Sequence, residues 1–381
     1  MKAQAARTAD PSSSPLPAAA AAVLSPALSG YLDLWRLAAA LLVFAHHASY
    51  SRWDGGWVAP LAGYGHEAVV VFFVLSGFVI AFVREAKDRT ASDYAISRIS
   101  RLVSVAWPAL IVGLCMDAIG RAWAPAAYHD VNQPLGAALA SMAFVNEFWI
   151  GGWHAGSNIP LWSLSFEAGY YLLFGLWAFA PQRALWLGAA VLLVGPKILL
   201  LMPAWLLGAW VYQAAKRPGS ARLNWALALG GAAWALLWAL GKIGNRYITW
   251  RIETRIGPDL WALAGHSSAF ISDNLIALGF ALHVLGVARL LRSRALPAGW
   301  AQRLNRASLA TFPLYLFHYP ALYFFTALST VWFSKPVGLF IGLASLLFSL
   351  AMTGPCERLR QHLRGLLQRR CRFWALGLGR P

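Results

Sequence analysis

Three residues able to do chemistry share the first apolar stretch of the chain, residues 32–50. They are Asp33, Arg36 and His47. Eleven positions separate Arg36 from His47, which on an α-helix is three turns plus about 20°, so both side chains lie on one face about 16 Å apart. Ionisable groups inside a membrane are costly and usually face a protein interior or a wet cavity. The spacing predicts a base at one depth and an anion-binding arginine at another, with Asp33 on the same face three residues before Arg36.

The same pair has a simpler interpretation. Arg36 would then be a helix-end cation that reaches the membrane surface along its aliphatic stem, and His47 a core histidine with its hydrogen bonds satisfied. His46 lies about 100° round the helix from His47, and we predict that it is the structural member of the two.

The composition predicts the elements that must position these residues. Of 381 residues, 59% are hydrophobic and 12% charged, about half the charged fraction of a soluble domain. The apolar residues gather in runs near bilayer length, which predicts an all-α, polytopic membrane protein with about ten transmembrane helices. The expected spans are residues 32–50, 67–84, 102–120, 160–180, 184–195, 198–213, 224–241, 268–288, 308–328 and 336–354.

The formal net charge of +17 is carried mainly by short loops between apolar runs, where basic residues set topology. We therefore expect both termini in the cytoplasm and no nucleic-acid partner. The fifth and sixth spans, interrupted by Pro196 and Pro203, are kept apart because merging them would place basic loops outside. The expected divisions are a disordered cytoplasmic tail at 1–28, a membrane domain at 29–356, and a basic amphipathic cytoplasmic tail at 357–381.

Depth along the expected spans groups further polar residues. Glu167 would lie about 10 Å below the outer end of its helix, close to the depth of His47, as an orienting carboxylate would. Ser76 and Gly77 fall near mid-membrane, where glycine permits close approach of a helix or a ligand. At the cytoplasmic end, Arg98 and Arg101 are expected to join Arg36 in binding a polyanion, although simple topology anchors are the alternative.

Five short motifs in this order resemble those of the acyltransferase-3 family of bacterial membrane acyltransferases, which O-acylate sugars and other hydroxyl acceptors. Together they extend over residues 31 to about 360, and Glu357 after the last span also fits. The motifs are LDLWR at 32–36 followed by His47, FFVLSGF at 72–78, RISR at 98–101, LWSLSFE at 161–167 and PLYLFH at 313–318.

The resemblance implies an acyl-CoA donor, acetyl-CoA in particular, as co-substrate, with no permanently bound cofactor or metal. The donor would enter from the cytoplasm at the arginines, with Ser76 and Gly77 above them. His47 would act as base or transient acyl carrier beside Glu167 and Asp33. The acceptor would be a sugar, glycan or lipid-linked saccharide, with Trp162, Tyr315 and His318 on the substrate side. The resemblance also implies a location in the bacterial inner membrane, in contact with membrane lipids. It leaves the oligomeric state open.

Two departures from the family pattern and two rival functions remain. Ser104 stands where the family often has proline, and Ala168 and Gly169 replace larger residues after Glu167; both changes are expected to reshape the acceptor pocket. Exposed tryptophans such as Trp53 would stack on sugars or anchor the interface. The rivals are a proton-coupled transporter, against which no inverted repeat is visible, and a relay that only moves acyl groups across the membrane.

Overall fold

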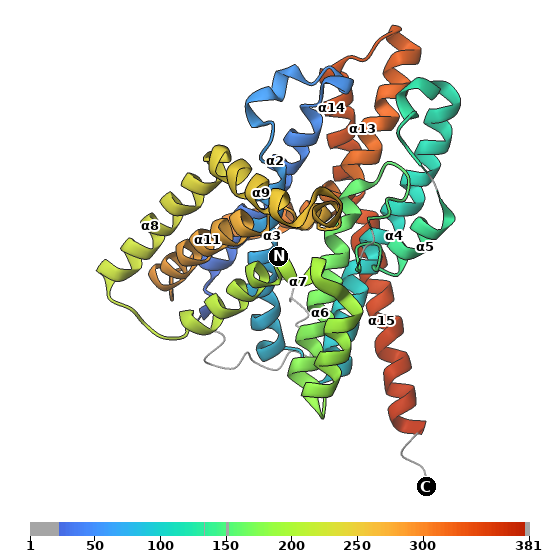
Figure 1. The fold of residues 1–381 in the computed structure, drawn as a ribbon. Helices are drawn as coiled ribbons and strands as arrows, with labels where there is room; N and C mark the ends of the chain where they lie inside the picture. Colours follow the sequence, from blue (N-terminus) through green and yellow to red (C-terminus); the bar gives the residue numbers. More distant parts are fainter. Residues whose placement is uncertain (1–22, 133, 150–151, 378–381) are drawn as a thin grey trace, which may run out of the picture.

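The computed structural model describes residues 23–132, 134–149 and 152–377 (Figure 1). Over these ranges the chain forms helices and no strand, which confirms the all-α class. The α-helices are α2 Pro26–Ala48, α3 Gly65–Ala86, α4 Ala91–Trp123, α5 Leu135–Met142, α6 Trp162–Phe179, α7 Arg183–Ala215, α8 Ala221–Leu240, α9 Lys242–Ile256, α10 Pro258–Ala262, α11 Phe270–Leu290, α12 Ala298–Leu309, α13 Thr311–Phe333, α14 Gly338–Ala351 and α15 Thr353–Gly377. Short 3-10 turns lie between them: η1 Ser51–Trp53, η2 Gly56–Leu61, η3 Pro125–Tyr128, η4 Ile159–Leu161 and η5 Gly265–Ser267.

Seven helices in the described part of the chain are long and apolar enough to cross a membrane. They are α2, α3, α4, α7, α8, α11 and the segment Gly338–Cys371, which joins α14 to most of α15. The protein is therefore a multi-pass membrane protein, but the expected count of about ten spans is not confirmed. The two counts differ for two reasons. Neither α6 nor α13 is among the seven long, apolar helices, and α7 combines two of the expected spans.

Local sequence signals explain where the first helices of the site begin. Ser25 caps α2 by accepting a hydrogen bond from the Leu28 N–H at 3.1 Å, and Pro26 occupies the first turn, where no N–H is needed. Thr90 and Asp93 form a reciprocal capping box at the start of α4. These caps fix the registers that place Arg36 and Arg101 at the same end of the bundle.

The α2 helix defines the two ends of the bundle. Arg36, in its first half, lines a cavity together with Arg101 of α4. His47, in its last turn, is bonded to His318 of α13. We call these the Arg36 end and the His47 end. The helix α15 projects beyond the Arg36 end, as the red ribbon in Figure 1 shows.

The long helix α7 is broken at Gly195, whose φ of 80° and ψ of 174° are not helical. A Cβ at Gly195 would lie 2.9 Å from the Trp149 backbone, so only glycine fits this close crossing. The two arms then run along the same groove, since Leu187 of the first arm and Gln213 of the second both line it. The expected break between the fifth and sixth spans is thus present inside one helix.

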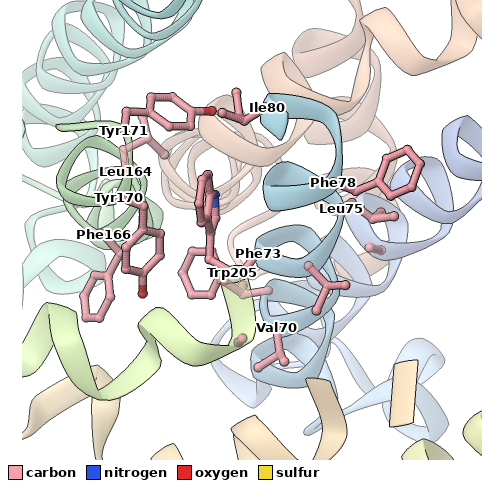
Figure 2. Close-up of a cluster of buried hydrophobic side chains, with 14 of the residues drawn as sticks. Val70, Phe73, Leu75, Phe78, Ile80, Leu164, Phe166, Tyr170, Tyr171 and Trp205 are labelled. Atoms are coloured by element: carbon pink, nitrogen blue, oxygen red, sulfur yellow. The ribbon is translucent and has the colours of Figure 1, made fainter. Parts of the chain in front are cut away.

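A tightly packed crossing of α3 and α7 supports the site. Built Cβ atoms at Gly77 and Gly208 would lie 1.9 Å from the carbonyl oxygens of Trp205 and Val74, so the two backbones are in direct contact. Figure 2 shows the Trp205 side chain beside α3, facing aromatic side chains of α6. Trp205 is completely buried, and its Nε1–H donates to Ser76 Oγ at 3.2 Å, so this core holds Ser76 in place.

Candidate active site

The proposed base, His47, is hydrogen-bonded to a second histidine. His47 Nδ1 and His318 Nε2 are 2.8 Å apart, with the two rings stacked at an interplanar angle of 23°. The other nitrogen of His318, Nδ1, lies 2.9 Å from the Leu314 carbonyl oxygen, which can only accept. A neutral His318 therefore donates from Nδ1 and accepts at Nε2. His47 in turn donates from Nδ1, which leaves a lone pair on its Nε2, as a general base requires.

The neighbouring residues hold the end of α2 rather than take part in chemistry. His46 accepts the Gly63 N–H at Nδ1 (2.7 Å), and its Nε2 lies 3.1 Å from Tyr50 Oη. Trp53 is buried, and its Nε1–H donates to the His47 carbonyl at 2.7 Å. The geometry agrees with a structural His46. The suggestion that Trp53 stacks on sugars is wrong, because its ring belongs to the core.

A cavity of about 470 Å³ opens at the Arg36 end. Arg36 Nη1 lies 3.2 Å from Asp33 Oδ1, so the ion pair that the resemblance implies between these two residues is present. Arg101 also faces this cavity, and within the described chain it has no carboxylate partner in ion-pair distance. Sequence reasoning missed the α12 residues and much of α15 here; the additional lining includes Ser104, Asn305, Ser308, Thr353, Glu357 and Arg360.

A second, smaller cavity of about 70 Å³ lies deeper in the bundle. We call the two the donor cavity and the inner cavity. They share Arg36, Arg101 and the start of α13, so the two arginines stand at the neck between them. The inner cavity also contains Glu167 and Ser76. A negatively charged molecule held at the neck would thus place its far end beside a carboxylate and a hydroxyl.

Glu167 is held on one of its two oxygens. Ser76 Oγ donates to Oε1 at 2.7 Å, and the Tyr171 hydroxyl donates to the same atom. In the described part of the chain, no hydrogen bond reaches Oε2, and the residue lines the inner cavity. Sequence reasoning expected Glu167 near the depth of His47, but its partners are Ser76 and Tyr171. Its role stays a prediction.

Tyr315 separates the inner cavity from the histidine pair. Its ring contacts that of Phe72 at 5.8 Å and that of His318 at 6.4 Å between centroids, and it lines the inner cavity. Its hydroxyl is 2.7 Å from Ser163 Oγ. His47 itself lines neither cavity.

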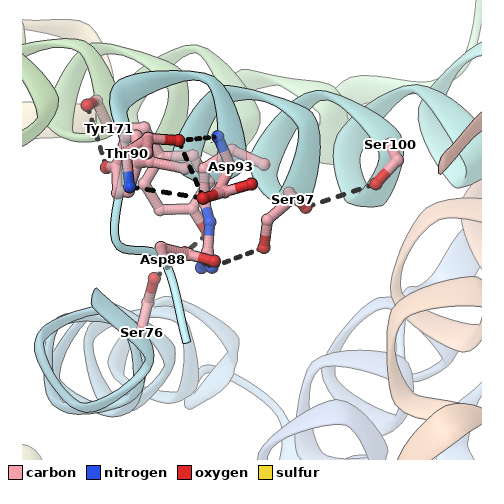
Figure 3. A network of polar contacts seen from close by, with 9 residues as sticks. Ser76, Asp88, Thr90, Asp93, Ser97, Ser100 and Tyr171 are labelled. Carbon is pink, nitrogen blue, oxygen red and sulfur yellow. Dashed lines mark hydrogen bonds and ion pairs between the residues drawn. The ribbon is translucent and has the colours of Figure 1, made fainter. Parts of the chain in front are cut away.

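Arg98 lies apart from the other two arginines. It is nearly buried, donates to Asp88 at 2.8 Å and to Ser97 Oγ at 2.7 Å, and lines a groove between α4 and α6. Figure 3 shows Asp88 and Ser97 turned toward one another beside the start of α4. The structure therefore brings two of the three predicted arginines together. The acidic residue ten positions before Arg98 was the signal that could have indicated its separate pairing.

Two further predicted site residues, Gly77 and Trp162, make packing contacts. Gly77 faces the Trp205 backbone, which is the packing alternative rather than contact with a cavity. Trp162 stacks on His266, with ring centroids 4.3 Å apart and an interplanar angle of 4°. Of the departures from the family pattern, Ser104 faces the donor cavity rather than an acceptor pocket, and Gly169 packs against Ile198.

Charges at the His47 end are paired. Burial acts to raise the pKa of Glu147, but the hydrogen bond from His266 and the nearby Lys197 ammonium outweigh it, so the pKa is lowered. Burial also acts to raise the pKa of Asp130, but the hydrogen bond from Arg52, 2.7 Å away, outweighs it, so the pKa of this carboxyl is lowered. Both carboxylates stay ionised near neutrality and fasten loops at this end. In the described ranges, no group of three or more His, Cys, Asp or Glu side chains is arranged to hold a metal ion.

A helical membrane bundle with an oriented histidine, next to cavities carrying arginines and a carboxylate, is the kind of arrangement that group transfer within a membrane requires. The sequence comparisons agree with this class. A model of the acyltransferase domain of the acyltransferase-3 family matches residues 29–354, so the chain belongs to this family.

Two curated proteins illustrate the similarity. Nodulation protein 10 of Rhizobium leguminosarum bv. viciae is 25% identical over 368 residues, which cover 87% of this chain and 94% of that protein. Acyltransferase MdmB of Streptomyces mycarofaciens is 32% identical over 178 residues, 43% of each chain. No solved structure matches the chain. The chain is thus an acyltransferase, and its donor and acceptor remain to be assigned.

Proposed function

We propose that the protein is an integral-membrane O-acyltransferase that moves an acyl group, acetyl in the simplest case, from acyl-CoA to a hydroxyl of a sugar or glycan. The observation that carries this proposal is the His47–His318–Leu314 hydrogen-bond chain, which leaves the Nε2 of His47 as a free base. A hydroxyl is a weak nucleophile and requires such a base, positioned within hydrogen-bond reach of its proton.

The donor would bind from the Arg36 end. Phosphate groups of coenzyme A are polyanionic, and guanidinium groups bind them through paired, charge-assisted hydrogen bonds. Arg101 and Arg36 stand at the neck of the donor cavity, and Asp33 holds Arg36 there. The thioester would then lie in the inner cavity beside Glu167.

The proposed reaction balances without a further reactant. His47 Nε2 takes the proton of the acceptor hydroxyl, the oxygen attacks the thioester carbonyl, and the C–S bond breaks. The imidazolium returns the proton to the leaving thiolate of coenzyme A. His318 accepts the Nδ1–H bond of His47 throughout, while Glu167 Oε2 orients the acceptor by accepting a second hydroxyl. In the alternative route His47 Nε2 attacks the thioester carbonyl and the C–S bond breaks, which gives an acyl-imidazole and the thiolate of coenzyme A. The acceptor hydroxyl then attacks the acyl carbon, the C–N bond breaks, and the hydroxyl proton passes to the thiolate.

We place the protein in a bacterial inner membrane with the Arg36 end and both termini in the cytoplasm. The basic residues at that end support this orientation. In this arrangement α6, α13 and each arm of α7 also cross, in addition to the other apolar helices. The acceptor would then approach from the opposite side.

The experiment that tests this function uses the purified full chain in detergent with acetyl-CoA and a panel of saccharides. We expect release of free coenzyme A together with an acetylated saccharide, detected by mass spectrometry. A transporter would release no coenzyme A without a membrane, and a relay would release coenzyme A without forming the saccharide ester. Either of these results would contradict the proposal.

A further inference from the structure

A third cavity, of about 320 Å³, lies at the His47 end between α3, α8 and α11, and we call it the outer cavity. Neither the histidine pair nor the arginines of the donor cavity belong to it. Among the residues whose side chains the structure describes, its lining carries carboxylates, imidazoles, hydroxyls and one indole, and no lysine or arginine. The polar and aromatic residues used below are His66, Glu67, Trp238, His266, Ser272 and Asp273.

The polar groups of the outer cavity are organised rather than loosely exposed. His66 Nε2 lies 2.9 Å from Asp273 Oδ2, and the aspartate is 1% exposed. This buried carboxylate fixes the orientation of the His66 ring, as carboxylates that hydrogen-bond a histidine do in many binding sites. His266 is placed by Trp162, on which it stacks, and by Glu147, 3.5 Å from its Nδ1. These contacts leave a rigid polar wall facing the cavity.

Trp162 separates the outer cavity from the inner cavity. Its ring is parallel to His66, with centroids 5.9 Å apart, and to His266, both of which line the outer cavity. The next two residues, Ser163 and Leu164, line the inner cavity. Trp162 therefore lies between residues that line the two cavities.

The outer cavity also lies beside the base. Gly63 lines the cavity, and its N–H donates to His46, which precedes His47 in the chain. A hydroxyl of a molecule seated there would reach the histidine pair past Trp162 and then Tyr315, or past the end of α2.

The lining indicates the chemistry of the ligand. Carboxylates, imidazoles and serine hydroxyls bind neighbouring hydroxyl groups, and an indole face covers the C–H face of a sugar ring. The described lining sets carboxylates toward the cavity without a lysine or arginine beside them, which disfavours phosphate, sulfate and uronate groups. Ligand pockets have volumes from about 300 to 1,000 Å³, so this one is small and suits a short saccharide.

We propose that the outer cavity binds one neutral or amino-sugar unit of the acceptor, with Trp238 as its stacking platform and Trp162 as the partition toward the reaction site. This inference rests on the proposed function and names the place and charge class of its acceptor.

Calorimetry on the purified full chain in detergent tests the inference. The probes are the neutral cellotetraose and chitotetraose, the amino-sugar chitosan tetramer, and the anionic tetragalacturonate. We expect at least one of the first three to bind with a millimolar or lower Kd and tetragalacturonate to bind at least tenfold more weakly. Trp238→Ala should weaken saccharide binding at least tenfold, whereas Trp238→Phe should stay within about threefold because it keeps an aromatic face.

The matched control is Trp225→Ala, because Trp225 is an exposed tryptophan on the same helix and lies outside the cavity. It should leave the saccharide Kd unchanged, and all variants should bind acetyl-CoA as the parent does, which also shows that they are folded. Saccharide binding by Trp238→Ala within twofold of the parent, or no saccharide binding in the parent, overturns the inference.

The two proposals fail in different ways. If the parent forms acetylated saccharide and releases coenzyme A but Trp238→Ala does not affect saccharide binding, the outer cavity is not the acceptor site and the acyltransferase proposal stands. If the parent binds saccharide in a Trp238-dependent manner but neither binds acetyl-CoA nor releases coenzyme A, the site stands and the proposed reaction is wrong.

Discussion

At the scale of single residues, the site depends on which nitrogen of His47 carries the proton. The Leu314 carbonyl fixes the tautomer of His318, and His318 fixes that of His47. This series of hydrogen bonds resembles a catalytic triad, in which a third group orients the base. Here the orienting group is an imidazole in place of a carboxylate. His318 is therefore a positioning residue, since it acts through His47.

Removing the orienting ring should slow turnover without weakening donor binding. We expect His318→Ala to lower kcat about 100-fold, within the range for loss of an aligned general base, while KM for acetyl-CoA changes less than twofold. His318→Gln should recover part of the rate, because its amide oxygen can accept the His47 Nδ1–H. Steady-state kinetics check this, and an unchanged kcat in His318→Ala would show that the stacked pair is only packing.

Arg101 and Arg98 should also differ in how much each contributes to acetyl-CoA binding. Arg101 has no carboxylate partner in ion-pair distance in the described chain, so Arg101→Ala should raise the Kd for acetyl-CoA about tenfold or more by loss of charged hydrogen bonds. The control is the double variant Arg98→Gln, Asp88→Asn, which removes the other arginine without leaving a lone buried charge. It should bind acetyl-CoA as the parent does. Equal loss of affinity in both would restore the three-arginine clamp expected from the sequence.

At the scale of elements, the crossing of α3 and α7 sets the position of the inner cavity. Backbone contact at Gly77 lets the Trp205 indole reach Ser76, which in turn binds Glu167. A one-residue change in this crossing therefore moves a polar network as well as an apolar one.

A methyl group at this crossing is expected to separate the helices. Gly77→Ala places a Cβ 1.9 Å from the Trp205 carbonyl oxygen, and overpacking of this kind costs about 1–3 kcal/mol. Thermal unfolding in detergent should show a Tm lower by several degrees. The control is Gly230→Ala on α8, which meets nothing within 4 Å and should be neutral or slightly stabilising. A Tm at Gly77→Ala equal to that of the control would contradict the packing role.

The sequence allowed a prediction of which residues share a helix face, but not of their partners. Helical periodicity placed Asp33, Arg36 and His47 on one face because that geometry is local. The pairing of Ser76 with Glu167, 91 positions apart, depends on how three helices pack, which periodicity does not encode. The count of about ten spans is not confirmed, in part because the break at Gly195 lies inside one helix that combines two of the expected spans.

At the scale of the whole molecule, the cavities lie in series between the two ends. The donor cavity opens at the Arg36 end, the inner cavity adjoins it, and the outer cavity lies at the His47 end behind Trp162. Donor and acceptor would thus meet in the middle of the bundle from opposite sides.

Sealed proteoliposomes should reveal this sidedness. With acetyl-CoA outside and a saccharide acceptor in the lumen, we expect acetylated saccharide to form, because inward-facing and outward-facing chains are both present. With both substrates outside, the same vesicles should give little product until detergent opens them. Equal product before and after opening would mean that both substrates enter from one side, contrary to the arrangement of the cavities.

The central claim is that His47 is the base, and one rate measurement tests it most directly. Single-turnover acetyl transfer by the purified full chain is compared for the parent and for His47→Ala, with acetyl-CoA binding measured on the same samples. We predict that His47→Ala lowers the transfer rate by about 100- to 10,000-fold, while the Kd for acetyl-CoA stays within twofold of the parent value. Transfer by His47→Ala at more than a tenth of the parent rate, with normal acetyl-CoA binding, would contradict the account.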